Sequence, residues 1–305
     1  MGWNSRVEYT RVDYQVHTFL SHDGRATMLE HCARAMALGL DEIGFSEHKD
    51  FDPNDPVVEY FDYDLFMDDI TYVRDLFRGR LRIRAGVEID YQQWFEPDVR
   101  VWLSQYPFDY VLGCVHYVDA LMLMTDDYVQ RFPTAREAYQ RYYEEVLHSV
   151  ESGLIDIVGH LEYAKRRGVP RFGAFDPQPY REHLFTLFDL MVEKGTVLEI
   201  NTAGLRQDAR DFYPCRQTLQ WYYERGGRLI TFGSDAHHPD ELAHCLPDAV
   251  RMVSLAPARA AGLSDRGAVV PGQRADLLLV REGRVETVLV AGRKVLDTVD
   301  RPACV

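Results

Sequence analysis

Seven short apolar runs in this chain each end on, or lead directly into, a histidine, a carboxylate or an amide. The runs are VDYQVH, EIGFSEH, RIRAGVE, DYVLGCVH, IDIVGH, VLEIN and LITFGSDAH. Between them lie segments whose apolar residues recur at three- and four-residue intervals, which predicts helices over residues 26–39, 63–77, 135–153, 180–195 and 215–227. Strands that alternate with helices indicate a parallel sheet. Seven units in about 250 residues favour a (β/α)8-type barrel that is one strand short over a doubly wound open sheet.

Composition and charge limit the compartment in which the protein is expected and the partners it is expected to bind. A net charge of −14 argues against a nucleic-acid surface. No apolar run approaches the ~18 residues of a membrane span, and the start of the chain has no apolar signal core. Five scattered cysteines without a Cys-x-x-Cys pair indicate no disulfide framework and no structural zinc knuckle. We therefore expect a cytoplasmic protein with neither nucleic-acid nor membrane partners.

The polar residues at the strand ends form a set of metal-type ligands. The set comprises His17, Asp23, His48, Glu88, His116, His160, Asp235 and His237. Imidazole nitrogens mixed with carboxylate oxygens suit zinc, iron or manganese better than magnesium or calcium. A single histidine at such a position is more often a packing residue than a metal ligand. A whole set of such residues at strand ends indicates a functional site instead. Eight ligands exceed the need of one ion, so we expect two or three divalent metal ions.

The phrases around these residues resemble the signature blocks of the PHP (polymerase and histidinol phosphatase) family. The blocks are DYQVHT, GLDEIGFSEHKDF, YPFDYVLGCVHY, VGHLEY, LEINTAGLR and GSDAHHP, in order from about residue 11 to 255. The histidinol-phosphate phosphatase branch is the most similar. The resemblance implies a distorted (β/α)7 barrel with a two- or three-metal site.

The resemblance also implies roles for the individual residues. His17, a bridging Glu88 and Asp235 match ligands of a first metal, and His116 and His160 match a second. A third metal would be held by Asp23, His48 and His237.

Two positions depart from the family pattern. The family's His-x-His opening is here Gln15-Val16-His17. An amide oxygen is a weaker ligand than imidazole, so we expect the first metal site to lose affinity or change its metal preference. Gln15 would ligate through its oxygen, or a water would take its place. Glu162 stands where relatives usually carry Asp, and we expect it to orient a ligand.

A small phosphorylated metabolite would need cations beyond the metals. Arg206 and Arg166 resemble phosphate-binding positions of the histidinol phosphatases, and Lys49 is a third candidate. We expect a metal-bridging hydroxide to attack phosphorus, with Arg206 stabilising charge and Asp235 or His237 assisting proton transfer to the leaving alcohol.

The sequence pattern changes near residue 256. Glycine and proline residues interrupt the chain there and precede two strand-like runs around Glu282-Gly283. We therefore predict a barrel domain over residues 1–256 and a small C-terminal β appendage over 257–305. This appendage resembles the closing segment of metal-dependent amidohydrolases. A passive appendage is the favoured interpretation, and pairing of exposed strand edges in a homodimer is the alternative.

Three other functions stay open. A PHP phosphoesterase could act on a sugar phosphate, a nucleotide or a cyclic phosphodiester, because ligands hardly distinguish substrates within a family. An amidohydrolase-type C–N hydrolase is suggested by the tail, although no metal-bridging lysine stands at a strand end. A binding module without catalysis is suggested by Gln15.

Overall fold

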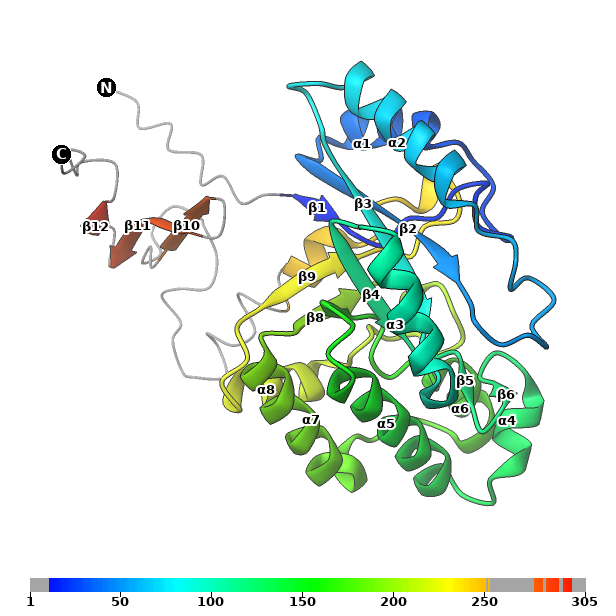
Figure 1. Cartoon of the computed structure of the whole chain (residues 1–305). Helices are drawn as coiled ribbons and strands as arrows, with labels where there is room; N and C mark the ends of the chain where they lie inside the picture. Colours follow the sequence, from blue (N-terminus) through cyan, green and yellow to red (C-terminus); the bar gives the residue numbers. More distant parts are fainter. Residues whose placement is uncertain (1–10, 251, 253–276, 282–283, 291–292, 298–305) are drawn as a thin grey trace. The chain divides into compact units, whose positions relative to one another are not determined.

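The structure is a computed structural model that describes residues 11–250, 252, 277–281, 284–290 and 293–297 (Figure 1). Its contacts divide the chain into a unit of Arg11–Leu246 and a unit that combines Met1–Thr10 with Pro247–Val305. The predicted domain boundary at residue 256 lies outside the described residues and stays a prediction.

Seven parallel strands form the sheet of the larger unit, and they are hydrogen-bonded in chain order. The strands are β1 (Val12–Asp13), β2 (Glu42–Lys49), β3 (Arg82–Asp90), β4 (Tyr110–Cys114), β7 (Ile157–Val158), β8 (Val197–Asn201) and β9 (Ile230–Gly233). The backbone N–H groups of Tyr14 and His17 donate to the carbonyls of Phe232 and Ala236, both at 2.9 Å. These bonds bring the first strand to the last, so the sheet is nearly closed into a barrel. The predicted seven-stranded barrel is confirmed.

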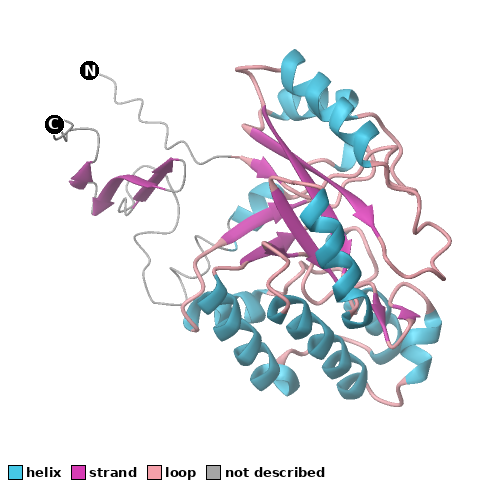
Figure 2. Cartoon of the chain, in the orientation of Figure 1, coloured by secondary structure: helices cyan, strands magenta, loops and turns pink. Residues whose placement is uncertain are grey.

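Helices surround the strands of this unit (Figure 2). Five of them confirm the helices predicted from apolar periodicity: α1 (Met28–Leu38), α2 (Tyr63–Leu76), α5 (Ala135–Glu151), α7 (Arg181–Lys194) and α8 (Arg216–Glu224). Apolar periodicity did not predict α3 (Glu96–Gln105), α4 (Asp126–Arg131) and α6 (Lys165–Phe172). In the part of the chain that the structure describes, 3-10 turns occur at Gln93–Phe95, Gln178–Tyr180, Ala203–Leu205 and Pro239–Glu241. None of the helices that the structure describes is both long and apolar enough to cross a bilayer.

The local sequence explains where α1 begins and ends. The Thr27 side chain accepts from the Glu30 backbone N–H while the Glu30 carboxylate accepts from the Thr27 backbone, a reciprocal cap. Gly39 ends the helix with φ 72°, a left-handed conformation that glycine adopts without steric cost. Buried Met28, Cys32 and Ala35 recur at the helical interval and face the barrel unit's core.

Antiparallel pairing appears in two small sheets. β5 (Tyr117–Val118) and β6 (Leu121–Met122) form a short hairpin after β4. In the smaller unit, β10 (Leu277–Arg281), β11 (Arg284–Val290) and β12 (Arg293–Asp297) form a three-stranded sheet in chain order. The predicted two-strand hairpin around residues 282–283 corresponds to β10 and β11, and the structure adds β12 as a third strand.

Candidate metal centre

The barrel brings the predicted ligands to the carboxyl ends of six strands. Glu88 lies in β3 and His48 in β2, whereas His17, His116, His160 and Asp235 follow β1, β4, β7 and β9. In parallel β/α folds this end of the sheet carries the functional side chains. The convergence therefore follows from the topology.

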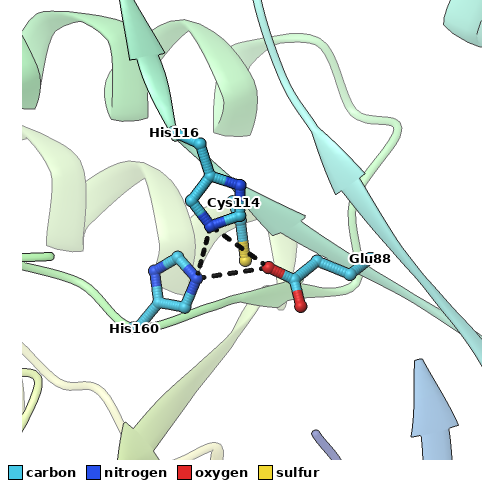
Figure 3. A group of neighbouring side chains, drawn as sticks. All are labelled: Glu88, Cys114, His116 and His160. Atoms are coloured by element: carbon cyan, nitrogen blue, oxygen red, sulfur yellow. Dashed lines mark hydrogen bonds and ion pairs between the residues drawn. The ribbon is translucent and has the colours of Figure 1, made fainter. Parts of the chain in front are cut away.

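One ligand group consists of Glu88, His116 and His160, whose polar atoms point toward one another (Figure 3). His116 Nε2 lies 3.1 Å from His160 Nε2 and 3.4 Å from Glu88 Oε1, and His160 Nε2 lies 3.2 Å from the same oxygen. A tetrahedral zinc ion with bonds of about 2.05 Å would set neighbouring ligand atoms about 3.3 Å apart. The three atoms have the spacing that such an ion requires.

Cys114 belongs to the same group but was not predicted from the sequence. Its Sγ lies within 4.8 Å of the Glu88, His116 and His160 ligand atoms (Figure 3), and the side chain is buried. A thiolate favours zinc or iron over manganese. The signal was present in the sequence, because Cys114 stands two residues before His116 and alternate strand residues share a face.

The second oxygen of Glu88 belongs to a neighbouring group. His17 Nε2 lies 3.2 Å from Glu88 Oε2 and 3.4 Å from Asp235 Oδ1. Glu88 thus presents one oxygen to each group, which is the arrangement of a bridging carboxylate.

A third group joins His48 and His237 to Asp23. His237 Nε2 lies 3.1 Å from Asp23 Oδ2, and His48 Nε2 lies 3.7 Å from Asp23 Oδ1. The His17 ring stacks on both the His48 and His237 rings, with centroid distances of 4.3 and 4.4 Å, and those two rings lie 5.9 Å from each other. All eight ligand positions predicted from the sequence therefore lie in one continuous cluster.

Hydrogen bonds around His17 leave its Nε2 lone pair facing the cluster. The Ser21 hydroxyl donates to Glu47 Oε2 at 2.5 Å, so its oxygen is free to accept from His17 Nδ1, which lies 3.3 Å away. That assigns the proton to Nδ1 and leaves Nε2, buried and without a hydrogen-bond partner, opposite two carboxylate oxygens. Three converging lone pairs repel one another unless a cation lies between them, so the donor set fits a metal ion.

Burial lowers the pKa of an imidazole, but at His17 and His160 the facing carboxylates outweigh it and raise the pKa. At His116 and His48 burial dominates, and with the neighbouring imidazoles it lowers the pKa to about 3 and about 4. A neutral imidazole keeps the lone pair that ligation needs. His160 and Asp235 also hold positive φ angles of 25° and 54°, a costly backbone conformation for residues other than glycine that is concentrated at functional sites.

A pocket of about 700 Å³ opens over the cluster, and Arg166 and Arg206 line it. Arg206 Nη2 donates to the carbonyls of Ser234 and Asp235 at 3.0 and 3.2 Å, while its Nη1 is buried and has no hydrogen-bond partner among the described residues. Arg166 Nη1 donates to the Tyr163 hydroxyl at 2.5 Å. Both guanidinium groups are thus held at the wall of the pocket.

Lys49 does not join them. Its Nζ donates to the Val58 carbonyl at 2.9 Å and lies 5.1 Å from the centre of the Phe51 ring, and Lys49 is not part of the pocket wall. The structure therefore separates Lys49 from the two arginines with which the sequence grouped it.

Acidic groups line another part of the same pocket. Asp50 and Asp55 both contribute to the wall, and the Tyr117 hydroxyl donates to Asp55 Oδ2 at 2.7 Å. Burial and the neighbouring Asp55 raise the pKa of Asp50 to about 7. The pocket thus combines cationic and acidic walls around the ligand cluster.

Glu162 occupies a different environment from the one the sequence suggested. Its carboxylate accepts from the Cys215 backbone N–H at 2.8 Å and from the Thr218 hydroxyl, and it pairs with Lys165 Nζ at 2.8 Å. These partners belong to the N-terminal end of α8 and to a buried lysine, and none of them is a metal-type ligand. Lys165 was missed by the sequence analysis because a lysine in a charged run usually lies on the surface.

The chain is similar in sequence to a known protein family and to individual relatives. The PHP domain model matches residues 13–203. A probable histidinol-phosphatase from Deinococcus radiodurans is 30% identical over 253 residues, covering 79% of this chain and 92% of the relative. The histidinol-phosphatase of Lactococcus lactis is 29% identical over 238 residues, covering 74% of this chain and 84% of the relative.

Among solved structures, the chain is similar to the histidinol phosphate phosphatase of Lactococcus lactis in complex with zinc, L-histidinol and phosphate. The TM-score is 0.73 at 26% identity, covering 80% of this chain and 92% of that one. A putative histidinol phosphatase from Listeria monocytogenes has the same fold, with a TM-score of 0.71 at 20% identity.

Proposed function

Because the chain belongs to the PHP-domain family, we propose that it is a metal-dependent phosphomonoesterase that hydrolyses L-histidinol phosphate to L-histidinol and phosphate. The observation that carries this proposal is one pocket whose wall combines metal-type ligands with Arg166 and Arg206 and with an acidic wall of Asp50 and Asp55. The relatives named histidinol-phosphatase support the choice of substrate.

The residues would hold two or three divalent ions, and zinc is the favoured one. Glu88, His116 and His160, with Cys114 beside them, form one site, and His17 and Asp235 form the next with the other oxygen of Glu88. Asp23, His48 and His237 would form the third. When bound, such ions lower the pKa of water and stabilise charge on phosphoryl oxygens.

Arg206 and Arg166 would bind the phosphate. The unpartnered Nη1 of Arg206 is a donor that the protein itself leaves unsatisfied, and a phosphate oxygen would satisfy it. The bonds from Nη2 to two backbone carbonyls fix the guanidinium in place, so little side-chain entropy is lost on binding. Asp235 and His237 also line the pocket and are our candidates for delivering the proton to the leaving alcohol.

The acidic wall favours a substrate that carries a positive charge away from its phosphate. L-Histidinol phosphate has an ammonium group and an imidazole, whereas a sugar phosphate has neither. Asp50 and Asp55 would pair with these groups through charge-assisted hydrogen bonds. This wall is the feature that favours histidinol phosphate over the other phosphoesters.

Phosphate release from a panel of esters tests the proposal. The zinc-loaded protein should hydrolyse histidinol phosphate faster than a sugar phosphate, a nucleotide or a cyclic phosphodiester, and His116→Ala should lose activity toward all of them. Asp55→Asn should raise KM for histidinol phosphate by about tenfold, the loss of one charge-assisted contact, and leave KM for glycerol phosphate unchanged. Equal effects on both esters would contradict the assigned role of the acidic wall.

A further inference from the structure

Gln15 lies against one residue of the ligand cluster, Glu88, and is fully buried; its amide connects two other buried side chains. Its Nε2 lies 2.6 Å from Glu88 Oε2, and its Oε1 lies 2.6 Å from Asn201 Nδ2. Because an amide has one donor end and one acceptor end, the identity of the atom that faces Glu88 decides whether Gln15 can ligate a metal.

The orientation of Asn201 is set by the backbone. Asn201 Oδ1 accepts from the Ala203 backbone N–H at 2.8 Å, so the other end of this amide, Nδ2, must donate. Nδ2 then faces Gln15 Oε1 at 2.6 Å and Glu199 Oε2 at 3.2 Å. Both partners are acceptors, which is consistent with that orientation.

The orientation of Gln15 follows from that of Asn201. Rotating the Gln15 amide by 180° would place two donors against each other at Asn201 and two oxygens against each other at Glu88, both at 2.6 Å. The observed orientation satisfies both ends, and the reversed one satisfies neither. The NH2 group of Gln15 therefore faces the cluster, and its nitrogen lone pair is delocalised into the amide and unavailable to a metal.

We propose that Gln15 contributes no donor atom to the metal centre and is instead a positioning residue that holds Glu88 Oε2. The site of His17, Glu88 and Asp235 then has three protein ligands, and one of them shares its oxygen with a hydrogen bond. A site with an open position and a partly occupied carboxylate binds its ion more weakly than one with a fourth protein ligand. This ion is consequently bound more weakly than it would be with an imidazole at position 15.

The inference rests on the metal centre of the proposed function, but metal counting tests it without any substrate. The protein and its variants are loaded with excess zinc, dialysed against a weak chelator and analysed for retained zinc. Gln15→His should retain about one equivalent more than the parent chain, because imidazole supplies the missing fourth ligand. Gln15→Leu should retain as much zinc as the parent.

The matched control is Gln92→His, which introduces a histidine at another buried glutamine and should leave the zinc content unchanged. Thermal unfolding of each variant verifies that it is folded. The cobalt(II) absorption spectrum should change on Gln15→His, which adds a ligand, and on Gln15→Leu, which releases Glu88 Oε2, but not on Gln92→His. A Gln15→His variant that gains no zinc, or a Gln15→Leu variant that loses one equivalent, would overturn the proposal.

Discussion

The buried pair of Glu162 and Lys165 allows a quantitative test of how this barrel holds its pocket wall. Both side chains have 0% exposure, and their charged atoms lie 2.8 Å apart. Lys165 Nζ also donates to the Phe212 carbonyl at 2.7 Å and to Asp211 Oδ2 at 3.1 Å. The pair therefore ties the start of α6 to the segment that follows the pocket residue Arg206.

Lys165→Met removes the cation and leaves the Glu162 carboxylate buried without its counter-charge. Breaking a buried ion pair in this way costs about 3–5 kcal/mol of unfolding free energy. Glu162→Gln should cost less, about 3 kcal/mol or below, because Lys165 keeps two acceptors and the amide oxygen can still accept from Cys215 N–H. In the double variant neither charge is left unpaired, so its cost should fall at least about 2 kcal/mol short of the sum.

The assay is urea unfolding of the four proteins after chelation, so that metal binding does not contribute. Arg171→Met, an exposed position on the same helix, is the matched control and should change stability by no more than about 0.5 kcal/mol. The reasoning is refuted if Lys165→Met costs less than about 1 kcal/mol, or if the two single costs simply add.

Three further outcomes are expected. Arg206→Lys should weaken inhibition by inorganic phosphate about tenfold or more, since a guanidinium contact is lost. The same change at the exposed Arg210 should not weaken it, and equal effects of the two variants would contradict the assignment of Arg206 to phosphate binding. Burial raises the pKa of Glu42, but hydrogen bonds, above all from Arg84, outweigh it and lower the pKa below its ordinary value of 4.5. Denaturation curves should therefore show Glu42→Gln less stable than the parent at neutral pH, and the two stabilities should converge as the pH falls below about 4. A stability difference that stays constant with pH would exclude ionisation of Glu42 as its cause. Removing metal with a chelator should abolish phosphate release and lower Tm, and added zinc should restore both; an unchanged Tm would argue against a bound ion.

Chain order alone was enough to gather the metal-type ligands. Strands that alternate with helices must run parallel, so residues at their carboxyl ends share one edge of the sheet. That reasoning brought together residues as far apart as His17 and Asp235, and the structure places their side chains 3.4 Å apart. The five periodic helices were predictable for a similar reason, since the spacing of apolar residues is a local property.

Side-chain orientation was not predictable in this way. Lys49 directly follows a ligand, yet its ammonium group reaches the Val58 carbonyl instead of the pocket. Lys165 reads as part of a charged surface run, but it is buried against Glu162 and Asp211. Val58 and Asp211 come from other segments of the chain than the lysines they bind, and apolar periodicity carries no information about such partners.

Gln15 shows most clearly which features follow from the sequence and which depend on the tertiary structure. The barrel, the edge at which the ligands meet, and an amide where the resemblance implied an imidazole could all be deduced from the chain order of residues. The end of that amide that faces Glu88 could not, because the residue that orients it, Asn201, lies 186 residues away at the end of β8. Hydrogen-bond direction depends on what surrounds a group in three dimensions, and here a backbone N–H at Ala203 sets it.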